Sequence, residues 1–159
     1  MSPGDLQSLG MGKGRMRIFI AGIMQGSRRD NGVDDQTYRQ RITSAIRARI
    51  PDADIVDPWA LHPDSPAYGD DQARQVFMGF NSAAATANVL VAYLPEASMG
   101  TAIEMWQAFQ AGARIYTISP LSENWVVKFL SHRVFATLDE FVQFVERGEL
   151  ETLALSHSL

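Results

Sequence analysis

The apolar residues of this chain follow two alternating patterns. Short runs that are apolar almost throughout, such as NVLVAYL at 88–94, are typical of buried strands. They alternate with longer segments, such as 34–50, in which apolar residues recur at helical intervals. This alternation predicts an α/β fold in which a parallel sheet has helices on both faces. The expected strands lie within 15–22, 53–58, 88–94, 113–119 and 133–136, and the expected helices within 34–50, 71–86, 101–112, 122–131 and 138–147.

The length of the chain allows one ordinary hydrophobic core. With 159 residues, of which 46% are hydrophobic, we expect a single domain. The alternating pattern covers 15–148, so the domain is placed there. The remaining residues are expected to form a disordered leader over 1–14 and a C-terminal tail over 149–159.

Charge and composition exclude several classes of partner. A net charge of -4 provides no general attraction for a nucleic acid polymer or an anionic membrane. No apolar run reaches the roughly 20 residues of a membrane span, and MSPGDLQSLGMGKG lacks the features of a signal peptide. Without cysteine the chain has no disulfide and no thiol nucleophile. We therefore expect a soluble, cytoplasmic protein.

Two loops follow strands that we expect to be neighbours. GIMQGSRRD at 22–30 follows the first strand, and PEASMG at 95–100 follows the third. In a doubly wound five-stranded sheet of order 2-1-3-4-5 these loops face each other across the crevice where ligands bind. The first loop could wrap a phosphate, but it lacks the spacing of a P-loop or a dinucleotide fingerprint, and Arg28 and Arg29 also fit a solvated loop.

The segment after the third strand has two interpretations. Thr101 and Glu104 fit a capping box, in which Thr101 caps the helix and Glu104 reaches back to its backbone. Alternatively, Ser98, Gly100 and Thr101 hold an anion at the helix N-terminus while Glu104 points into the crevice. Both interpretations use the same carboxylate.

Three segments, IFIAGIMQGSRRD, NVLVAYLP and EASMGTAIEMWQA, occur in an order and spacing that resemble the nucleoside 2-deoxyribosyltransferase superfamily. The similarity is strongest to its nucleoside 5'-monophosphate N-glycosidase branch and covers about residues 15–120. The resemblance implies a flavodoxin-like sheet, with Glu104 as nucleophile, Ser98 as phosphate-binding serine and Gly100 at a backbone turn. It also implies a binding role for the first loop through Gly22, Gly26, Ser27 and Arg28.

The chemistry implied by this resemblance needs one carboxylate. A carboxylate that attacks C1' of a nucleoside or nucleoside 5'-monophosphate forms a glycosyl ester through an oxocarbenium-like transition state. Water then completes hydrolysis, or a second base completes exchange, and the departing base needs a proton. We expect no cofactor and no metal, because His62, His132 and His157 lack metal-ligand spacing.

The sequence also departs from the pattern of this superfamily. Its base-contacting acidic residue falls at Phe80, with Asn81 beside it, and Asp70 and Asp71 lie upstream. Its frequent active-site tyrosine is Phe19, a substitution that resembles ribonucleotide-preferring members. These departures leave a nucleotide-binding sensor without turnover as the alternative to an enzyme. A third hypothesis is an interaction domain in which Glu104 only caps a helix.

Aromatic residues and a later loop supply the remaining candidates. Trp59 and His62, in the long loop after the second strand, either contact a base or fold back onto the core. Trp106 is expected in the core. The resemblance also implies a homodimer in which the partner subunit completes the site, with Ser122, Asn124 and Lys128 as candidates.

Overall fold

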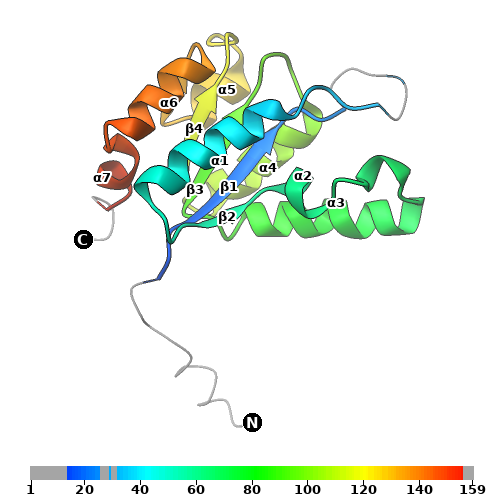
Figure 1. Cartoon of the computed structure of the whole chain (residues 1–159). Coiled ribbons are helices and arrows are strands. Elements are labelled where there is room, and N and C mark those ends of the chain that lie inside the picture. Colours follow the sequence, from blue (N-terminus) through cyan, green and yellow to red (C-terminus); the bar gives the residue numbers. More distant parts are fainter. Residues whose placement is uncertain (1–13, 26–28, 30–31, 156–159) are drawn as a thin grey trace, which may run out of the picture.

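The computed structural model describes residues 14–25, 29 and 32–155 of the chain. Its centre is a five-stranded parallel sheet in the order β2-β1-β3-β4-β5 (Figure 1). This confirms the predicted flavodoxin-like sheet. The strands are β1 Arg17–Gly22, β2 Asp54–Val56, β3 Val89–Tyr93, β4 Arg114–Ile118 and β5 Arg133–Phe135.

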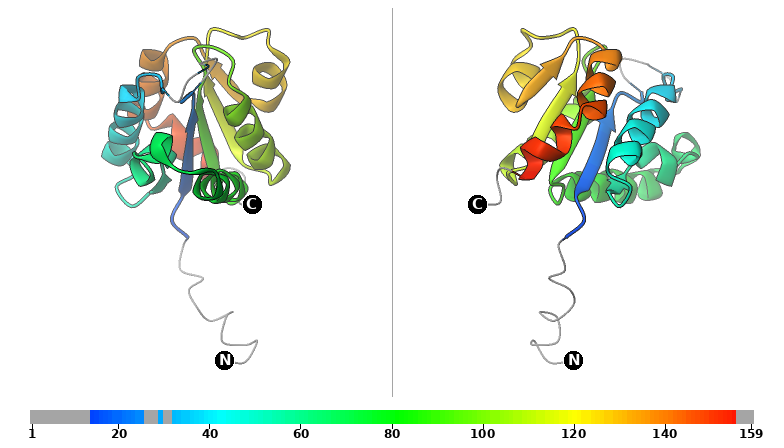
Figure 2. Two further views of the ribbon diagram at one scale, coloured as in Figure 1. Left: turned by 90° about the vertical axis from the view of Figure 1, so that its right-hand side faces the viewer. Right: turned by 60° about the vertical axis from the view of Figure 1, so that its left-hand side comes forward.

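Helices cover both faces of the sheet, as predicted. Helices α1, α6 and α7 pack on one face, and α3, α4 and α5 pack on the other (Figures 1 and 2). Two short turns, α2 and η1, lie in the long segment between β2 and α3, which the sequence analysis describes as a loop. The helices are α1 Thr37–Arg49, α2 Pro58–Leu61, η1 Ser65–Ala67, α3 Asp70–Ala84, α4 Met99–Gln110, α5 Trp125–Leu130, α6 Leu138–Glu146 and α7 Glu149–Leu155.

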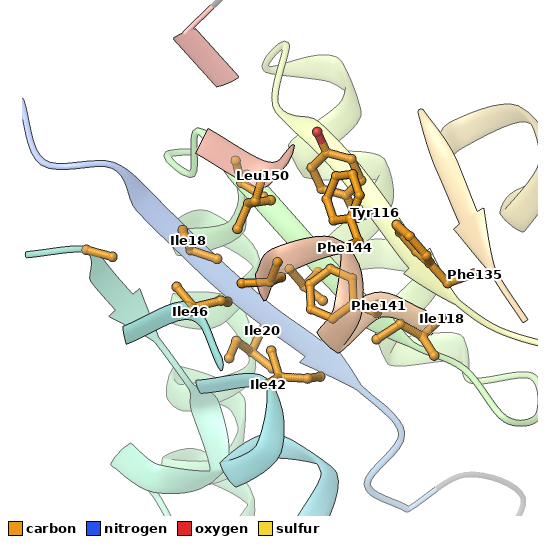
Figure 3. Packing of buried hydrophobic residues seen from close by; sticks show 14 of the residues in the cluster. Ile18, Ile20, Ile42, Ile46, Tyr116, Ile118, Phe135, Phe141, Phe144 and Leu150 are labelled. Atoms are coloured by element: carbon orange, nitrogen blue, oxygen red, sulfur yellow. The ribbon is translucent and has the colours of Figure 1, made fainter. Parts of the chain in front are cut away.

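Each strand supplies both layers of the core, because successive side chains point to opposite faces of a sheet. In β1, Ile18 and Ile20 face α1 and α6, whereas Phe19 and Ala21 face α3 and α4. Figure 3 shows the first layer, where aromatic residues of α6 pack over the strands. The buried central strands leave only their ends available for a polar site.

The fold continues past the expected end of the domain at residue 148. The expected C-terminal tail, 149–159, begins with helix α7, whose Leu150 is fully buried in the layer beneath α1 and α6. Glu151 of the same helix forms an ion pair with Arg49 at 3.0 Å. Gly148 makes the turn between α6 and α7 with a φ of 76°, which glycine adopts without strain.

Helix α4 presents its tryptophan to the surface, which corrects the prediction that Trp106 lies in the core. The side chain is 47% exposed and stacks on Phe109. The core-facing positions of α4 are instead Thr101, Met105 and Ala108, one helical turn apart. Because Trp106 follows Met105 directly, it lies about 100° further round the helix and points away from the sheet.

None of the helices in the described ranges is long and apolar enough to cross a lipid bilayer.

Candidate active site

A cavity of about 470 Å³ lies where β1 and β3 end. Its walls come from the carboxyl end of β1, the first turns of α4, helix α3 and the segment between β2 and α3. This is the crevice where parallel α/β sheets bind ligands, because the strand order changes direction between β1 and β3. Gly22, Ser98, Gly100, Thr101 and Glu104, all selected from the sequence, line it together.

Ser98, and not Thr101, caps helix α4. The Ser98 hydroxyl accepts hydrogen bonds from the backbone N–H of Thr101 at 3.4 Å and from the Thr101 hydroxyl at 3.0 Å. Thr101 therefore lies inside the helix, and the capping box predicted between Thr101 and Glu104 is wrong. Glu104 is six residues past the cap, too far along the helix to reach the backbone of the first turn. The interaction-domain hypothesis, in which Glu104 only caps a helix, loses its basis.

Glu104 has the electrostatic environment of a desolvated acid. Burial raises the pKa of its carboxyl group to about 8, and the positive charge of Arg39 opposes this shift. Within the described ranges no hydrogen bond reaches the carboxylate. Glu104 thus has no hydrogen bond among the described residues and lines the cavity, as a nucleophile or a proton carrier would.

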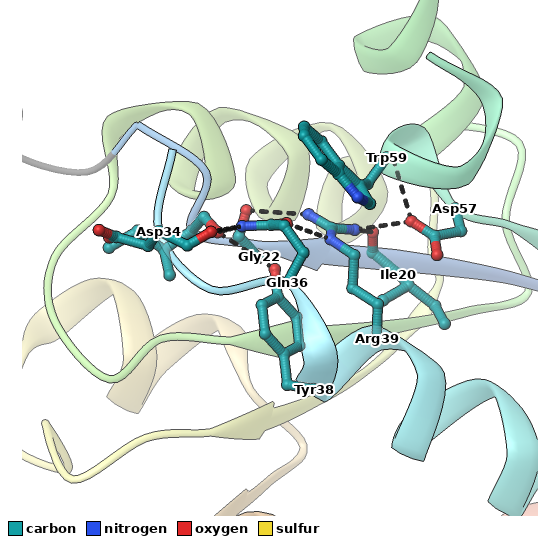
Figure 4. A network of polar contacts seen from close by, with 9 residues as sticks. Ile20, Gly22, Asp34, Gln36, Tyr38, Arg39, Asp57 and Trp59 are labelled. Atoms are coloured by element: carbon teal, nitrogen blue, oxygen red, sulfur yellow. Dashed lines mark hydrogen bonds and ion pairs between the residues drawn. The ribbon is translucent and has the colours of Figure 1, made fainter. Parts of the chain in front are cut away.

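Arg39, which was not predicted from the sequence, connects the end of β1 to Asp57 through hydrogen bonds (Figure 4). The guanidinium is only 2% exposed and donates to the carbonyl of Ile20 at 3.0 Å, to that of Gly22 at 3.3 Å and to the carboxylate of Asp57 at 2.9 Å. Asp57 also accepts the backbone N–H of Trp59. A buried cation therefore lies beside the end of β1. The sequence feature that could have identified it is an arginine on the apolar side of helix α1.

Gly22 is required by packing at the end of β1. A Cβ atom at this position would lie 2.1 Å from the Tyr38 hydroxyl oxygen. Tyr38 cannot easily move, because its ring stacks on Tyr93 at 4.1 Å and its hydroxyl donates to the carbonyl of Ile23. The resemblance implies a binding role for Gly22, and the structure adds a steric reason for the same residue.

Comparisons with known proteins bear on the fold. No family model and no curated protein matches the sequence. A conserved protein from Enterococcus faecalis V583 superposes with a TM-score of 0.59 at 16% identity, over 85% of this chain and 99% of that one. The 2-deoxyribosyltransferase of Bacillus psychrosaccharolyticus gives 0.56 at 13% identity, over 79% and 90%. This chain has the fold of a 2-deoxyribosyltransferase. The CMP N-glycosidase of Clostridium botulinum gives a TM-score of 0.48 at 17% identity, over 82% and 98%.

In this deoxyribosyltransferase-like fold, three of the predicted binding residues lie away from the cavity. Phe19 is fully buried in mid-strand, with its ring 6.5 Å from that of Phe80. Asn81 is buried and donates to the carbonyl of Phe77 in its own helix at 2.8 Å. Trp59 lies beside Arg39 (Figure 4). The predicted Gly26, Ser27 and Arg28 lie outside the described residues.

A group of three aromatic residues in the cavity lining was not predicted from the sequence. Tyr68, Phe77 and Phe80 all line the cavity. Phe80 stands where the resemblance places an acidic residue, and the upstream Asp70 and Asp71 are exposed at the start of α3, away from the lining. The carboxylate expected from the resemblance therefore has no replacement among the described residues of the cavity.

The candidates for a partner subunit's site have local roles in this chain. Asn124 caps helix α5 by accepting the backbone N–H groups of Val126 and Val127. Lys128 pairs with Glu123 at 2.9 Å, and Ser122 is exposed. None of the three lines the cavity of its own subunit as far as the structure describes it. Across the same ranges, no cluster of three potential metal ligands occurs.

Proposed function

We propose that this protein cleaves the N-glycosidic bond of a nucleoside or nucleoside 5'-monophosphate, with Glu104 as the nucleophile. The observation that carries the proposal is a desolvated carboxylate on α4, without a hydrogen bond among the described residues, in the cavity at the strand ends. The fold supports it, because a solved 2-deoxyribosyltransferase shares this architecture. Neither a metal nor a cofactor is needed for this reaction.

The cavity offers a separate place for each part of such a substrate. A 5'-phosphate would lie at the N-terminus of α4, where Ser98, Gly100 and Thr101 present a hydroxyl group and the positive end of the helix dipole. The base would lie against the aromatic rings of Tyr68, Phe77 and Phe80. This orientation brings C1' of the sugar towards Glu104, which lies one turn further along the same helix.

The reaction then proceeds in two steps. The Glu104 carboxylate attacks C1' as the bond to the base breaks, and a glycosyl ester forms. Water releases the sugar, or a second base replaces the first. Only the ionised carboxylate is a nucleophile, so the raised pKa of Glu104 predicts that kcat/KM increases as the pH rises towards about 8.

The experiment is a test of base release. The purified protein is incubated with ribo- and deoxyribonucleoside 5'-monophosphates and the parent nucleosides, and free base is followed by chromatography. We expect release by the protein and by Glu146→Gln, an exposed control on α6, but not by Glu104→Gln. Addition of a second base distinguishes exchange from hydrolysis.

A nucleotide-binding sensor is the second candidate, and Phe80 is the observation that favours it. A phenylalanine cannot supply the proton that a departing base needs. If no substrate releases base, the glycosidase proposal fails. Calorimetric titration with the same compounds then tests the sensor, which should bind a nucleotide without consuming it.

We also propose that the protein is a homodimer through an apolar face. Large exposed apolar side chains gather on three adjacent helices, and Met99 among them is 85% exposed. A patch of this kind marks an interface. We assign it to a second copy because Phe77, Met99 and Ile103 belong both to this face and to the cavity lining, so a second copy would close the site. The apolar face consists of Phe77, Met78, Met99, Ile103, Trp106, Phe109, Trp125 and Phe129.

Light scattering on a sizing column tests this assembly. We expect a dimer for the parent protein and a monomer for Trp106→Asp. Leu61→Asp, which alters an exposed apolar residue outside the apolar face, should remain a dimer. A monomeric parent protein at micromolar concentration would contradict the proposal.

A further inference from the structure

Beside the cavity, a histidine and a tyrosine form a hydrogen-bonded pair. His62 Nδ1 lies 2.9 Å from the Tyr68 hydroxyl oxygen, and the two rings are nearly perpendicular, with their centroids 5.7 Å apart. The chain between them is a compact turn, in which Ser65 donates its backbone N–H to the carbonyl of His62 and Tyr68 donates to that of Ser65. The Phe80 ring packs against His62 at 5.5 Å. The turn and the Phe80 ring therefore fix the position of the pair.

Tyr68 faces the same cavity as Glu104. Among the described residues that line this cavity, these two alone carry a titratable side chain. They come from different elements, since Glu104 is on α4 and Tyr68 directly follows the η1 turn. A nucleophile and a proton donor on opposite sides of a glycosidic bond are the two groups that its cleavage requires.

We propose that Tyr68 is a catalytic residue that protonates the departing base, and that His62 is the positioning residue that holds its hydroxyl group. This rests on the proposed function. With a hydrogen on Nδ1, His62 donates to the phenol oxygen, and the phenol hydrogen is then free to point to the base. The pair thus supplies the proton for the departing base that Phe80, in place of an acidic residue, cannot supply.

The proton and the electron pairs balance over the two steps. In the first step a Glu104 oxygen bonds to C1', the electrons of the C1'–N bond pass to the base, and the base takes the phenol proton. The phenolate that results is stabilised by the Nδ1–H of His62. In the second step water bonds to C1' and displaces the Glu104 carboxylate. One proton of this water returns to the Tyr68 phenolate.

The test compares two leaving groups on the same sugar phosphate. One substrate is the nucleoside monophosphate that the protein cleaves. The other carries a p-nitrophenyl group in place of the base, and this group departs as the stable p-nitrophenolate anion without a proton. We expect Tyr68→Phe to lower kcat on the nucleotide by about 100-fold or more, with KM little changed. The same variant should cleave the nitrophenyl substrate at nearly the parent rate.

Three further variants separate catalysis from folding. His62→Ala should show a smaller loss that is again confined to the nucleotide, and His62→Gln, whose amide can still donate, should recover part of it. Tyr116→Phe removes a phenol from the core and should leave both rates unchanged.

An equal loss on both substrates, or no loss on either, in Tyr68→Phe overturns the inference. If the parent protein releases neither leaving group, it is the proposed function that has failed.

Discussion

Replacing Glu104 by glutamine should make the protein more stable while it abolishes activity. The pKa of Glu104 is raised from 4.5 to about 8 because its carboxyl group is desolvated in the cavity. The native state therefore holds a proton on this residue between pH 4.5 and 8, where the unfolded chain has released it. Consequently the free energy of unfolding of the parent protein falls as the pH rises through this interval and levels off above it.

The shift sets the size of the effect. A pKa change from 4.5 to about 8 corresponds to a loss of about 5 kcal/mol, at about 1.4 kcal/mol per unit. Because the cavity is open to water, only part of this loss should appear, and we expect about 2 kcal/mol. Glutamine has a similar shape and no charge, so its variant lacks this pH dependence. The stability difference between the two proteins should be small at pH 5 and about 2 kcal/mol in favour of glutamine at pH 9.

Urea unfolding at pH 5, 7 and 9 measures this difference. Every other titrating group is common to both proteins, so the difference in unfolding free energy isolates residue 104. Glu146→Gln serves as the matched control, because this exposed residue should give no change with pH. A difference that stays constant from pH 5 to pH 9 would refute the view that Glu104 is held in a desolvated state.

Two more substitutions test the floor of the cavity. Gly22→Ala should cost about 2 kcal/mol, because its Cβ would meet the Tyr38 hydroxyl, whereas Gly100→Ala, with nothing within 4 Å, should unfold at nearly the parent urea concentration. Arg39→Met should cost about 3 to 5 kcal/mol in the same assay, since it leaves Asp57 without its cation. Adding Asp57→Asn should recover part of that loss, and a purely additive double variant would argue against the pairing.

The general architecture could be read from the chain alone. Apolar runs alternating with helical periods are local properties, and they predicted the parallel sheet and the helices on both faces. The strand order was the one expected of a flavodoxin-like sheet, which the resemblance implied. The position of the site followed from the same pattern, because the loops after β1 and β3 must meet at one edge of such a sheet. Ser98 and Glu104 were selected in the segment that follows the third strand, and their roles there came from the family resemblance.

The details of the cavity depended on tertiary packing. The helical period of α1 marks Arg39 as inward-facing, but only the adjoining carbonyls and Asp57 explain how its charge is satisfied there. Similarly, His62 and Tyr68 are separated by a turn whose path is decided by contact with α3. Their meeting at the cavity could not be seen in the sequence.

The sequence by itself determined the parallel sheet and the helices that cover it, because strand and helix periods record which side chains leave water. The tertiary structure decided which side chains come into contact. It buried Arg39 at the end of β1, brought Tyr68 and Glu104 to the same cavity and left Trp106 exposed. Periodicity shows that a face is apolar or polar, but the charge environment of a group depends on neighbours brought by distant segments.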